Sequence, residues 1–338
     1  MNLSVAMFSA QRYDIDLFTA AGAHTPVTFT FFEARLNLTT CALARGYDAV
    51  CVFVNDDLNR EVLRELSALG VKHIALRCAG FNNVDTQAAK TLGMLVSRVP
   101  AYSPQSVAEH TLALILTLNR KTHHAYNRVR NGNFSLQGLM GFTLYQKTVG
   151  VIGTGAIGLA VINILAGFGC RIVCHDPAPA AAAQAQTNAR GGCYVSLDEL
   201  YTQSDIITLH CPLTHANHHL INAGAIEKMR PGITLINTSR GALIDTQAVI
   251  SALKRRHIKA LGLDVYEQES SLFFSDHSLE IIDDDVIERL LSFPNVLITG
   301  HQGFFTEEAL NQIVATTIDN LGAAEKGETS GPGFVVAG

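Results

Sequence analysis

The fold is decided by the stretch Thr148-Val-Gly-Val-Ile-Gly-Thr-Gly-Ala-Ile-Gly158. A strand-like apolar run leads into three glycines with Gly-x-Gly-x-x-Gly spacing, and a helical stretch follows from Ile157 to Phe168. In such a turn Gly153 permits the reversal, Gly155 lets backbone approach a pyrophosphate closely, and Gly158 lets the helix pack on the strand. The helix N-terminus then offers free amides to the anion. We therefore expect a Rossmann-type unit that binds a dinucleotide here.

An acidic residue stands where the following strand should end. The run Cys170 to His175 is typical of that strand, and Asp176 follows it at roughly the 20-residue spacing found in dinucleotide-binding units. A carboxylate there accepts hydrogen bonds from the adenosine ribose and repels a 2′-phosphate. No arginine directly follows Asp176. These features favour NAD over NADP as the cofactor.

Strand-like and helical runs alternate along most of the chain. We expect strands over 50–54, 71–77, 171–175, 206–210, 234–237 and 260–265, and a helix over 57–69. That alternation implies βαβ units and parallel sheets. Because 338 residues exceed the roughly 250 to 300 at which a single core stops growing, two domains are expected. The fold class is therefore α/β, with two doubly wound parallel-sheet domains.

Three further segments connect or end these units. Residues 104–130 carry apolar positions on one helical face, which predicts a long connecting helix that stops near Asn131-Gly132. A second helix should begin after Thr306, with that residue as its cap and two glutamates in its first turn. The glycine-rich tail 331–338 is expected to be loosely held.

Composition limits the classes of function. The net charge is −5 and the 25 basic residues are scattered, which argues against nucleic acid or a polybasic membrane surface as a partner. The N-terminus lacks a basic region and the apolar runs are too short to span a bilayer, so we expect a cytoplasmic protein with a small-molecule partner. The seven cysteines are odd in number and lie in apolar runs, which is typical of reduced interior thiols.

The histidine-rich segment His215-Ala-Asn-His218-His219 is a possible metal motif. It lies in a polar loop, and no carboxylate or thiol stands at ligand spacing in the sequence around it. We therefore expect no metal site.

Groups suited to reducing a 2-oxo acid follow three expected strands. Arg240 follows one strand, Asp264 and Glu269 follow the next, and His301 follows the last. In open parallel sheets, ligands bind at this carboxyl edge. Arginine can hold a carboxylate with two parallel hydrogen bonds, histidine can deliver a proton, and a nearby carboxylate can stabilise the charged imidazole.

These residues carry a resemblance to the D-2-hydroxyacid dehydrogenases that covers nearly the whole chain. It rests on the segments Leu76–Asp85, Val99–Pro104, Val107–His110, the glycine turn, His210–Thr214 and the Arg, Glu and His segments, which come in the family's order. Within the family the chain is most similar to fermentative D-lactate dehydrogenases, particularly through Arg77–Asp85, Asp264–Glu269 and Leu272–Asp276.

The resemblance implies a role for each of several residues. Arg240 would bind the substrate carboxylate, His301 would donate the proton, and Glu269 would hydrogen-bond His301. Substrate contacts would also come from Ala79, Gly80 and Tyr102. The cofactor-binding set would be Gly153, Gly155, Ala156, Ile157, Gly158, Asp176, Cys211, Pro212, Asn217, Thr238, Ser239 and Asp264.

The resemblance also implies an architecture and a reaction. Residues 1–101 and the returning segment 300–338 would form a flavodoxin-like substrate domain, and residues 102–299 a Rossmann NAD-binding domain. NADH would reduce pyruvate to D-lactate in a homodimer or homotetramer. Two alternatives stay open: a dehydrogenase of glycerate, phosphoglycerate or branched hydroxyacids, and an NAD-sensing transcriptional corepressor of the same fold.

Overall fold

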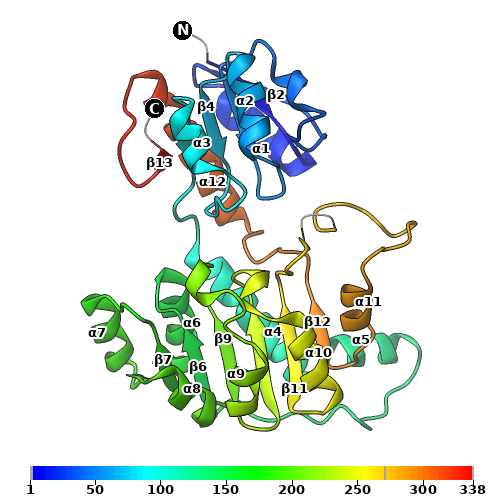
Figure 1. Ribbon diagram of the computed structural model, residues 1–338. Helices are drawn as coiled ribbons and strands as arrows, with labels where there is room; N and C mark the ends of the chain where they lie inside the picture. The colour runs from blue at the N-terminus through cyan, green and yellow to red at the C-terminus, as the bar shows by residue number, and fades with distance from the viewer. Residues whose placement is uncertain (1–2, 270–271, 337–338) are drawn as a thin grey trace. The chain divides into compact units, whose positions relative to one another are not determined.

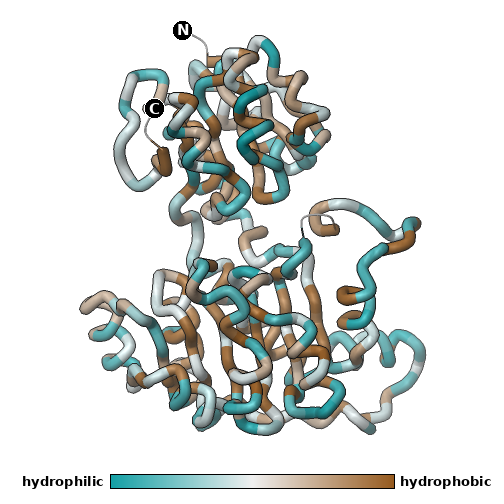
Figure 2. The backbone as a smooth tube through the Cα atoms, viewed as in Figure 1, coloured by the Kyte–Doolittle hydropathy of each residue, from teal (hydrophilic) through white to brown (hydrophobic). Residues whose placement is uncertain are grey.

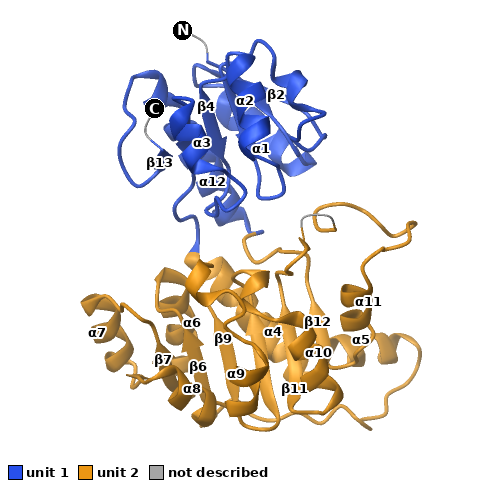
Figure 3. Ribbon diagram, in the orientation of Figure 1, with its two compact units in different colours: residues 1–103, 305–338 blue, residues 104–304 orange. Residues whose placement is uncertain are grey.

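A computed structural model describes residues 3–269 and 272–336. The chain divides into two compact units, shown in separate colours in Figure 3. Unit 1 holds residues 1–103 and 305–338, and unit 2 holds residues 104–304. The boundaries drawn from the sequence, at 101 and 299, lie slightly earlier in the chain. Each unit is described by itself below.

Unit 1 is built on a six-stranded sheet with the order β13-β5-β4-β3-β1-β2. Its elements are β1 (Leu3–Met7), α1 (Arg12–Gly22), β2 (Val27–Phe31), the 3-10 helix η1 (Cys41–Ala44), β3 (Ala49–Val52), α2 (Arg60–Ala68), β4 (His73–Leu76), α3 (Thr86–Thr91), β5 (Leu95–Ser97), α12 (Glu307–Glu325) and β13 (Phe334–Val336). The first five strands are parallel in the flavodoxin-like order 2-1-3-4-5.

The tail departs from the expectation of a loosely held segment. Within it, β13 pairs antiparallel with β5, Phe334 opposite Ser97 and Val336 opposite Val96. The pairing gives the edge strand β5 a partner on its open side. Residues 337 and 338 lie outside the described part of the chain.

Unit 2 is built on a seven-stranded parallel sheet with the order β12-β11-β10-β9-β6-β7-β8 (Figure 1). Its elements are α4 (Pro104–Arg120), α5 (Thr122–Arg130), β6 (Thr148–Ile152), α6 (Ala156–Gly167), β7 (Arg171–His175), α7 (Ala181–Ala189), β8 (Cys193–Tyr194), α8 (Leu197–Gln203), β9 (Ile206–Leu209), η2 (His215–Asn217), α9 (Ala223–Lys228), β10 (Ile233–Asn237), η3 (Gly241–Leu243), α10 (Thr246–Lys254), β11 (Ile258–Leu263), α11 (Asp285–Leu291) and β12 (Val296–Ile298). Numbered within the unit, the order is 3-2-1-4-5-6 with one added strand, the Rossmann arrangement.

Side chains of the unit 2 strands alternate between two cores, as period-two geometry requires. Val149 and Val151 of β6 pack with α4 and α6, whereas Ile152 belongs to a second core with α8, α9 and α10. The hydrophobic colour in Figure 2 accordingly follows the central strands. A parallel sheet covered on both faces presents its loops only at the edges, which is where a ligand can bind.

The prediction of one long helix over 104–130 is wrong in one respect, because the segment forms two helices, α4 and α5. Lys121 adopts a left-handed conformation with φ +51° between α4 and α5. Its Nζ donates hydrogen bonds to the carbonyl oxygens of Gly138 (2.8 Å) and Met140 (3.0 Å), which ties the break to a later loop. The expected stop is confirmed, since α5 ends at Arg130.

The cysteine expectation holds only in part. All seven cysteines are free, and five are buried. Cys170 is half-buried and Cys193 is exposed on the edge strand β8, so these two are not core residues. No helix among the described residues combines the length and the apolar composition needed to cross a bilayer.

The buried His73 of β4 makes unit 1 sensitive to acid. Its Nε2 lies 2.7 Å from the Ser97 hydroxyl, and burial lowers the pKa of His73 to about 4. The unfolded chain binds this proton at a higher pH than the folded chain does, so the free energy of unfolding should fall as pH drops from about 6.5 to about 4, by roughly 3 kcal/mol.

We expect His73→Asn to remove that part of the pH dependence. Urea unfolding at several pH values should give a shallower decline for the variant than for the unchanged chain, whatever its stability at neutral pH. Equal slopes for both proteins would contradict the assignment.

Candidate active site

The glycine turn has the geometry that close approach of a dinucleotide requires. Gly153 lies at φ +93°, and a Cβ there would stand 2.6 Å from the Cys211 nitrogen. A Cβ on Gly158 would stand 2.1 Å from the carbonyl oxygen of Gly153, so only glycine lets α6 begin at this distance from β6. A Cβ on Gly155 would meet nothing within 4 Å. The turn is therefore tight inside and open on its outer side.

The first turn of α6 offers amides to that open side. Gly155 is the N-cap, and no side chain among the described residues caps the helix. Ala156 and Ile157 are the first two helical residues. The helix N-terminus carries a partial positive charge, so these positions suit a pyrophosphate. The residues present thus fit the dinucleotide that the sequence predicts.

Asp176 stands at the end of β7 and faces the same turn. Its Oδ2 accepts hydrogen bonds from the Thr154 amide (2.9 Å) and hydroxyl (3.0 Å), and Oδ1 accepts one from the Ala178 amide (3.0 Å). Burial alone would raise the pKa of Asp176, but these bonds and nearby His175 outweigh it and lower the pKa. The carboxylate is thus held ionised beside the turn.

The glycine turn lies where the strand order of the unit 2 sheet reverses. β6 has β7 on one side and β9 on the other, so the loops after β6 and β9 diverge there. The Ser239 hydroxyl donates to the Cys211 carbonyl (2.7 Å), and the Asn217 amide donates to the Pro212 carbonyl (2.7 Å). The Thr238 hydroxyl pairs with that of Thr111 at 2.9 Å. The Ser239–Cys211 bond joins the loop after β10 to the loop after β9.

Arg240 follows β10, directly after Ser239. The Asn237 side chain donates to the Arg240 carbonyl (2.8 Å) and accepts from the Ser239 amide (3.0 Å), which fixes the backbone around the arginine. The guanidinium is half-buried, and its Nη1 donates to the Ser239 carbonyl (2.6 Å). The side chain is therefore anchored at one nitrogen and retains further donors for a ligand.

His301 and Glu269 are brought together across 32 residues of sequence. Nδ1 of His301 lies 2.9 Å from Oε1 of Glu269, and the other carboxylate oxygen accepts from the Tyr266 amide (3.0 Å). A carboxylate only accepts, so Nδ1 carries hydrogen and Nε2 is the nitrogen left to exchange a proton. The imidazole contacts the rings of Phe274 and Phe304, at centroid distances of 5.8 and 6.4 Å.

Asp264 positions the segment that carries His301. Its carboxylate is 1% exposed and accepts hydrogen bonds from the Gln302 amide (2.9 Å) and the Gly303 amide (2.8 Å), immediately after the histidine. The Thr299 hydroxyl also donates to it. Burial opposes ionisation, but hydrogen bonds from His110 and Thr299 lower the pKa of Asp264. Asp264 was expected among cofactor residues, and the structure shows it holding the loop that carries His301.

His110, on α4, is a site residue that the sequence reasoning missed. Its Nε2 lies 3.0 Å from the Thr299 hydroxyl and 3.2 Å from Oδ1 of Asp264. The imidazole is only 15% exposed. Its segment was noted for the family resemblance, but nothing in the local sequence indicated a contact with residues after β11 and β12.

The three catalytic candidates thus lie at one edge of the unit 2 sheet. β10, β11 and β12 are adjacent and parallel, with Asn237 opposite Leu263 and Leu263 opposite Ile298. Arg240 follows the first strand, Glu269 the second and His301 the third. Glu269 and His301 are in direct contact, and Arg240 comes from the neighbouring loop.

In unit 1 the expected substrate residues follow β4. The Ala79 carbonyl accepts from Arg98 (2.8 Å), and the Gly80 carbonyl faces the Cys78 thiol at 3.3 Å. The amides of Ala79 and Gly80 have no hydrogen-bond acceptor among the described residues. Two half-exposed amides without partners can bind an anionic ligand. Tyr102, half-buried, lies just before α4.

A buried ion pair stiffens the base of that segment. Arg77 is 2% exposed, and its guanidinium donates to the Ser9 carbonyl (2.8 Å) and to both oxygens of Asp14 (3.3 Å each). The ring of Phe53 stacks below it at 4.9 Å. A buried arginine bonded through Nε and Nη2 to these partners holds the chain rigidly where the Ala79 and Gly80 amides begin.

Residues 112–303 match the family described as D-isomer specific 2-hydroxyacid dehydrogenase, NAD binding domain. The chain belongs to the D-2-hydroxyacid dehydrogenases. It is an NAD-dependent enzyme of this family, as the glycine turn, Asp176 and the strand-end residues indicate.

Individual relatives agree with this membership. The chain is 53% identical to the D-lactate dehydrogenase of Escherichia coli over 327 residues, which cover 97% of this chain and 98% of the relative. The solved apo-structure of that species' D-lactate dehydrogenase matches with a TM-score of 0.88 and 50% identity, covering 99% and 100% of the two chains. A structure of D-lactate dehydrogenase from Aquifex aeolicus, complexed with NAD and lactic acid, matches with a TM-score of 0.87, 34% identity and 99% coverage of both.

The preference of this dehydrogenase for NADH over NADPH should depend on Asp176. We expect Asp176→Ala to raise the KM for NADH and to narrow the NADH/NADPH ratio of kcat/KM about tenfold, since hydrogen-bond acceptors for the ribose and a charge that repels a 2′-phosphate are both lost. Steady-state kinetics with each cofactor measure this.

Thr154→Val is the matched control, because it removes the Thr154 hydroxyl bond to Asp176 and keeps the carboxylate. It should leave the NADH/NADPH ratio near that of the unchanged enzyme. An unchanged ratio in the Asp176 variant would overturn the assignment.

Proposed function

We propose that this enzyme reduces pyruvate to D-lactate with NADH. The observation that carries the proposal is the His301–Glu269 pair, held by Asp264 next to the loop that carries Arg240. The supporting comparison is the extensive similarity to D-lactate dehydrogenases across both units. In this proposal unit 1 is the substrate domain and unit 2 binds the cofactor.

Arg240 binds the substrate carboxylate. A guanidinium forms two parallel charge-assisted hydrogen bonds with a carboxylate, which fixes the orientation of the neighbouring carbonyl. Within unit 1, the proposed substrate contacts are the Ala79 and Gly80 amides and Tyr102. Orientation of this kind is a large part of rate enhancement when two reactants must meet in line.

His301 supplies the proton and Glu269 positions it. NADH, when bound at the glycine turn, supplies the hydride. As charge develops on the substrate oxygen, Nε2 of His301 donates its proton to that oxygen. Glu269 holds Nδ1, fixes the ring orientation and stabilises the imidazolium. In the reverse direction the neutral imidazole accepts the proton from lactate.

The experiment that tests the proposal is a substrate panel. NADH oxidation is followed by its near-ultraviolet absorbance with pyruvate, 2-oxobutyrate, hydroxypyruvate, glyoxylate and phenylpyruvate. We expect pyruvate to give the highest kcat/KM. A clear preference for hydroxypyruvate or for a branched or aromatic 2-oxo acid would replace pyruvate as the substrate, and failure to turn over any of them would favour a corepressor role.

The pH dependence of turnover should report the His301–Glu269 pair. Pyruvate reduction needs the protonated imidazole, so its rate should fall as pH rises, and lactate oxidation should show the opposite trend. Glu269→Gln removes the charge that stabilises the imidazolium, so the decline in reduction should move to lower pH. Rate profiles of kcat/KM for pyruvate measure this.

Glu267→Gln is the matched control, since Glu267 lies in the same turn and bonds His219 instead of His301. Its profile should follow that of the unchanged enzyme. A Glu269→Gln profile that stays in place would count against the pairing.

The enzyme is proposed to be a homodimer or homotetramer, associated through unit 2. Support comes from an apolar arm, defined here as residues 126–145. Its exposed side chains include Phe134 (75%), Leu136 (83%) and Met140 (87%). Exposed apolar side chains in such density are typical of an association surface. Analytical ultracentrifugation should show more than one chain per particle.

The reduced state of the free cysteines suits the cytoplasm, where we place the enzyme.

A further inference from the structure

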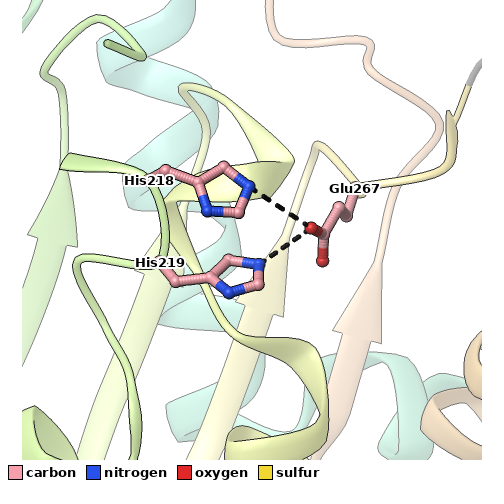
Figure 4. A group of neighbouring side chains, drawn as sticks. All are labelled: His218, His219 and Glu267. Atoms are coloured by element: carbon pink, nitrogen blue, oxygen red, sulfur yellow. Dashed lines mark hydrogen bonds and ion pairs between the residues drawn. The ribbon is translucent and has the colours of Figure 1, made fainter. Parts of the chain in front are cut away.

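We infer that unit 2 carries a site for a divalent transition metal ion such as Zn²⁺, formed by His218, His219 and Glu267. The three side chains converge from two loops, as Figure 4 shows. His218 and His219 follow the 3-10 helix η2, and Glu267 follows β11. No metal site is expected from the sequence, because no carboxylate stands near the histidines in it, but the fold brings Glu267 there from 48 residues away.

The ligand atoms already point at one another. Nε2 of His219 lies 2.8 Å from Oε1 of Glu267, and Nε2 of His218 lies 3.9 Å from the same oxygen. All three atoms fall within 4.8 Å of one another. Ligands of a tetrahedral zinc ion lie about 3.3 Å apart, so small side-chain rotations suffice to bind one. Imidazole protons move between ring nitrogens, which lets each Nε2 present a lone pair.

The backbone is arranged so that the two adjacent histidines face the same way. Neighbouring side chains on an extended chain point to opposite sides. His219 instead adopts φ +52°, in the left-handed region that is uncommon for residues other than glycine. The two rings consequently lie next to each other, tilted by 31°, with centroids 4.0 Å apart. Backbone strain of this kind tends to be kept where a ligand is held.

The chemistry of the set favours zinc over calcium or magnesium. Two imidazoles and one carboxylate match three-ligand zinc sites, whereas hard cations take oxygen ligands. The side chains of His218, His219 and Glu267 are 53%, 34% and 29% exposed. A fourth position is therefore open to water, and the ion can enter from solvent.

Metal binding would link two loops of the candidate active site. The His219 amide donates to the Ala242 carbonyl (2.9 Å), two residues after Arg240. A Cβ on Gly241 would stand 2.1 Å from the carbonyl carbon of Tyr266, so the Arg240 loop packs backbone to backbone against the Glu267 turn. An ion bound by His218, His219 and Glu267 adds a further link between these loops. It should stabilise the folded unit, because it binds the native state.

The test is zinc titration by isothermal calorimetry, with no cofactor present, and it does not depend on turnover. We expect the unchanged protein to have one zinc site per chain that Glu267→Gln and His219→Asn each weaken more than about tenfold. Glutamine keeps the shape of Glu267, and asparagine tolerates the left-handed backbone at position 219. His215→Ala, in the same loop but outside the three-residue set, should bind like the unchanged protein.

Two independent readouts complete the test. Zinc should raise the Tm of the unchanged protein and of His215→Ala, and raise it less in the other two variants. Cobalt should give a visible absorption band that both of those variants lose. Zinc affinity unchanged in Glu267→Gln and His219→Asn, or lost equally in His215→Ala, would overturn the ligand assignment.

Discussion

Arg240→Ala should lower kcat/KM for pyruvate by about 10³-fold, one of the two largest effects expected for single substitutions in this enzyme. The side chain would provide the paired hydrogen bonds to the substrate carboxylate, and loss of one partner of a desolvated charge pair costs about 2 to 5 kcal/mol. Because the same contact orients the carbonyl, kcat should fall and KM should rise together. Steady-state kinetics at saturating NADH measure kcat and KM separately.

Arg240→Lys distinguishes geometry from charge. It keeps the positive charge but lacks the planar fork, so it should recover only a small part of the loss. Arg255→Ala is the matched control, since this arginine forms an exposed ion pair with Glu227 on α9 and should leave kinetics unchanged. An Arg240→Ala enzyme with near-normal kcat/KM would remove Arg240 from the substrate site.

His301→Asn should lower kcat by about 10² to 10⁴-fold, the range that general acid catalysis contributes. Asparagine suits the backbone here, because His301 has φ +54° and asparagine is enriched in that region. The variant should therefore remain folded and should bind NADH as before. Stopped-flow single turnovers measure the loss in the chemical step, and fluorescence titration measures NADH binding.

The pH dependence of the residual rate provides the second criterion. If His301 is the proton donor, the decline of reduction with rising pH should disappear in the variant. His124→Asn, on α5, is the control and should keep the normal rate and profile. A His301→Asn enzyme that keeps the normal rate and the normal pH profile would contradict the role of His301 as proton donor.

The dinucleotide turn could be predicted from sequence because its geometry demands particular residues. Only glycine fits at positions 153 and 158, because a Cβ there would overlap backbone atoms, and this requirement is visible in the spacing alone. The strands of both sheets could be placed for a related reason. Buried parallel strands need continuous apolar runs, and such runs are short and recognisable.

Features that depend on distant contacts could not be predicted in the same way. The break at Lys121 is tied to carbonyl groups of a later loop, and β13 forms because β5 lies beside it. The role of His110 likewise depends on Asp264. In each case the local sequence is compatible with the simpler expectation, and tertiary packing decides otherwise.

The same distinction applies within the candidate site. Arg240, Glu269 and His301 were identified because chemically suitable side chains follow three successive strands and resemble a known family. The hydrogen bonds of Asp264 to the loop around His301 could not be predicted from its position after a strand. The proximity of Glu267 to His219 was hidden for the same reason.

The most direct test of the central claim is the configuration of the product. Purified enzyme is incubated with pyruvate and NADH, and the lactate formed is resolved by chiral chromatography. The proposed site predicts D-lactate in amounts equal to the NADH consumed. L-lactate, or no lactate at all, would contradict the account.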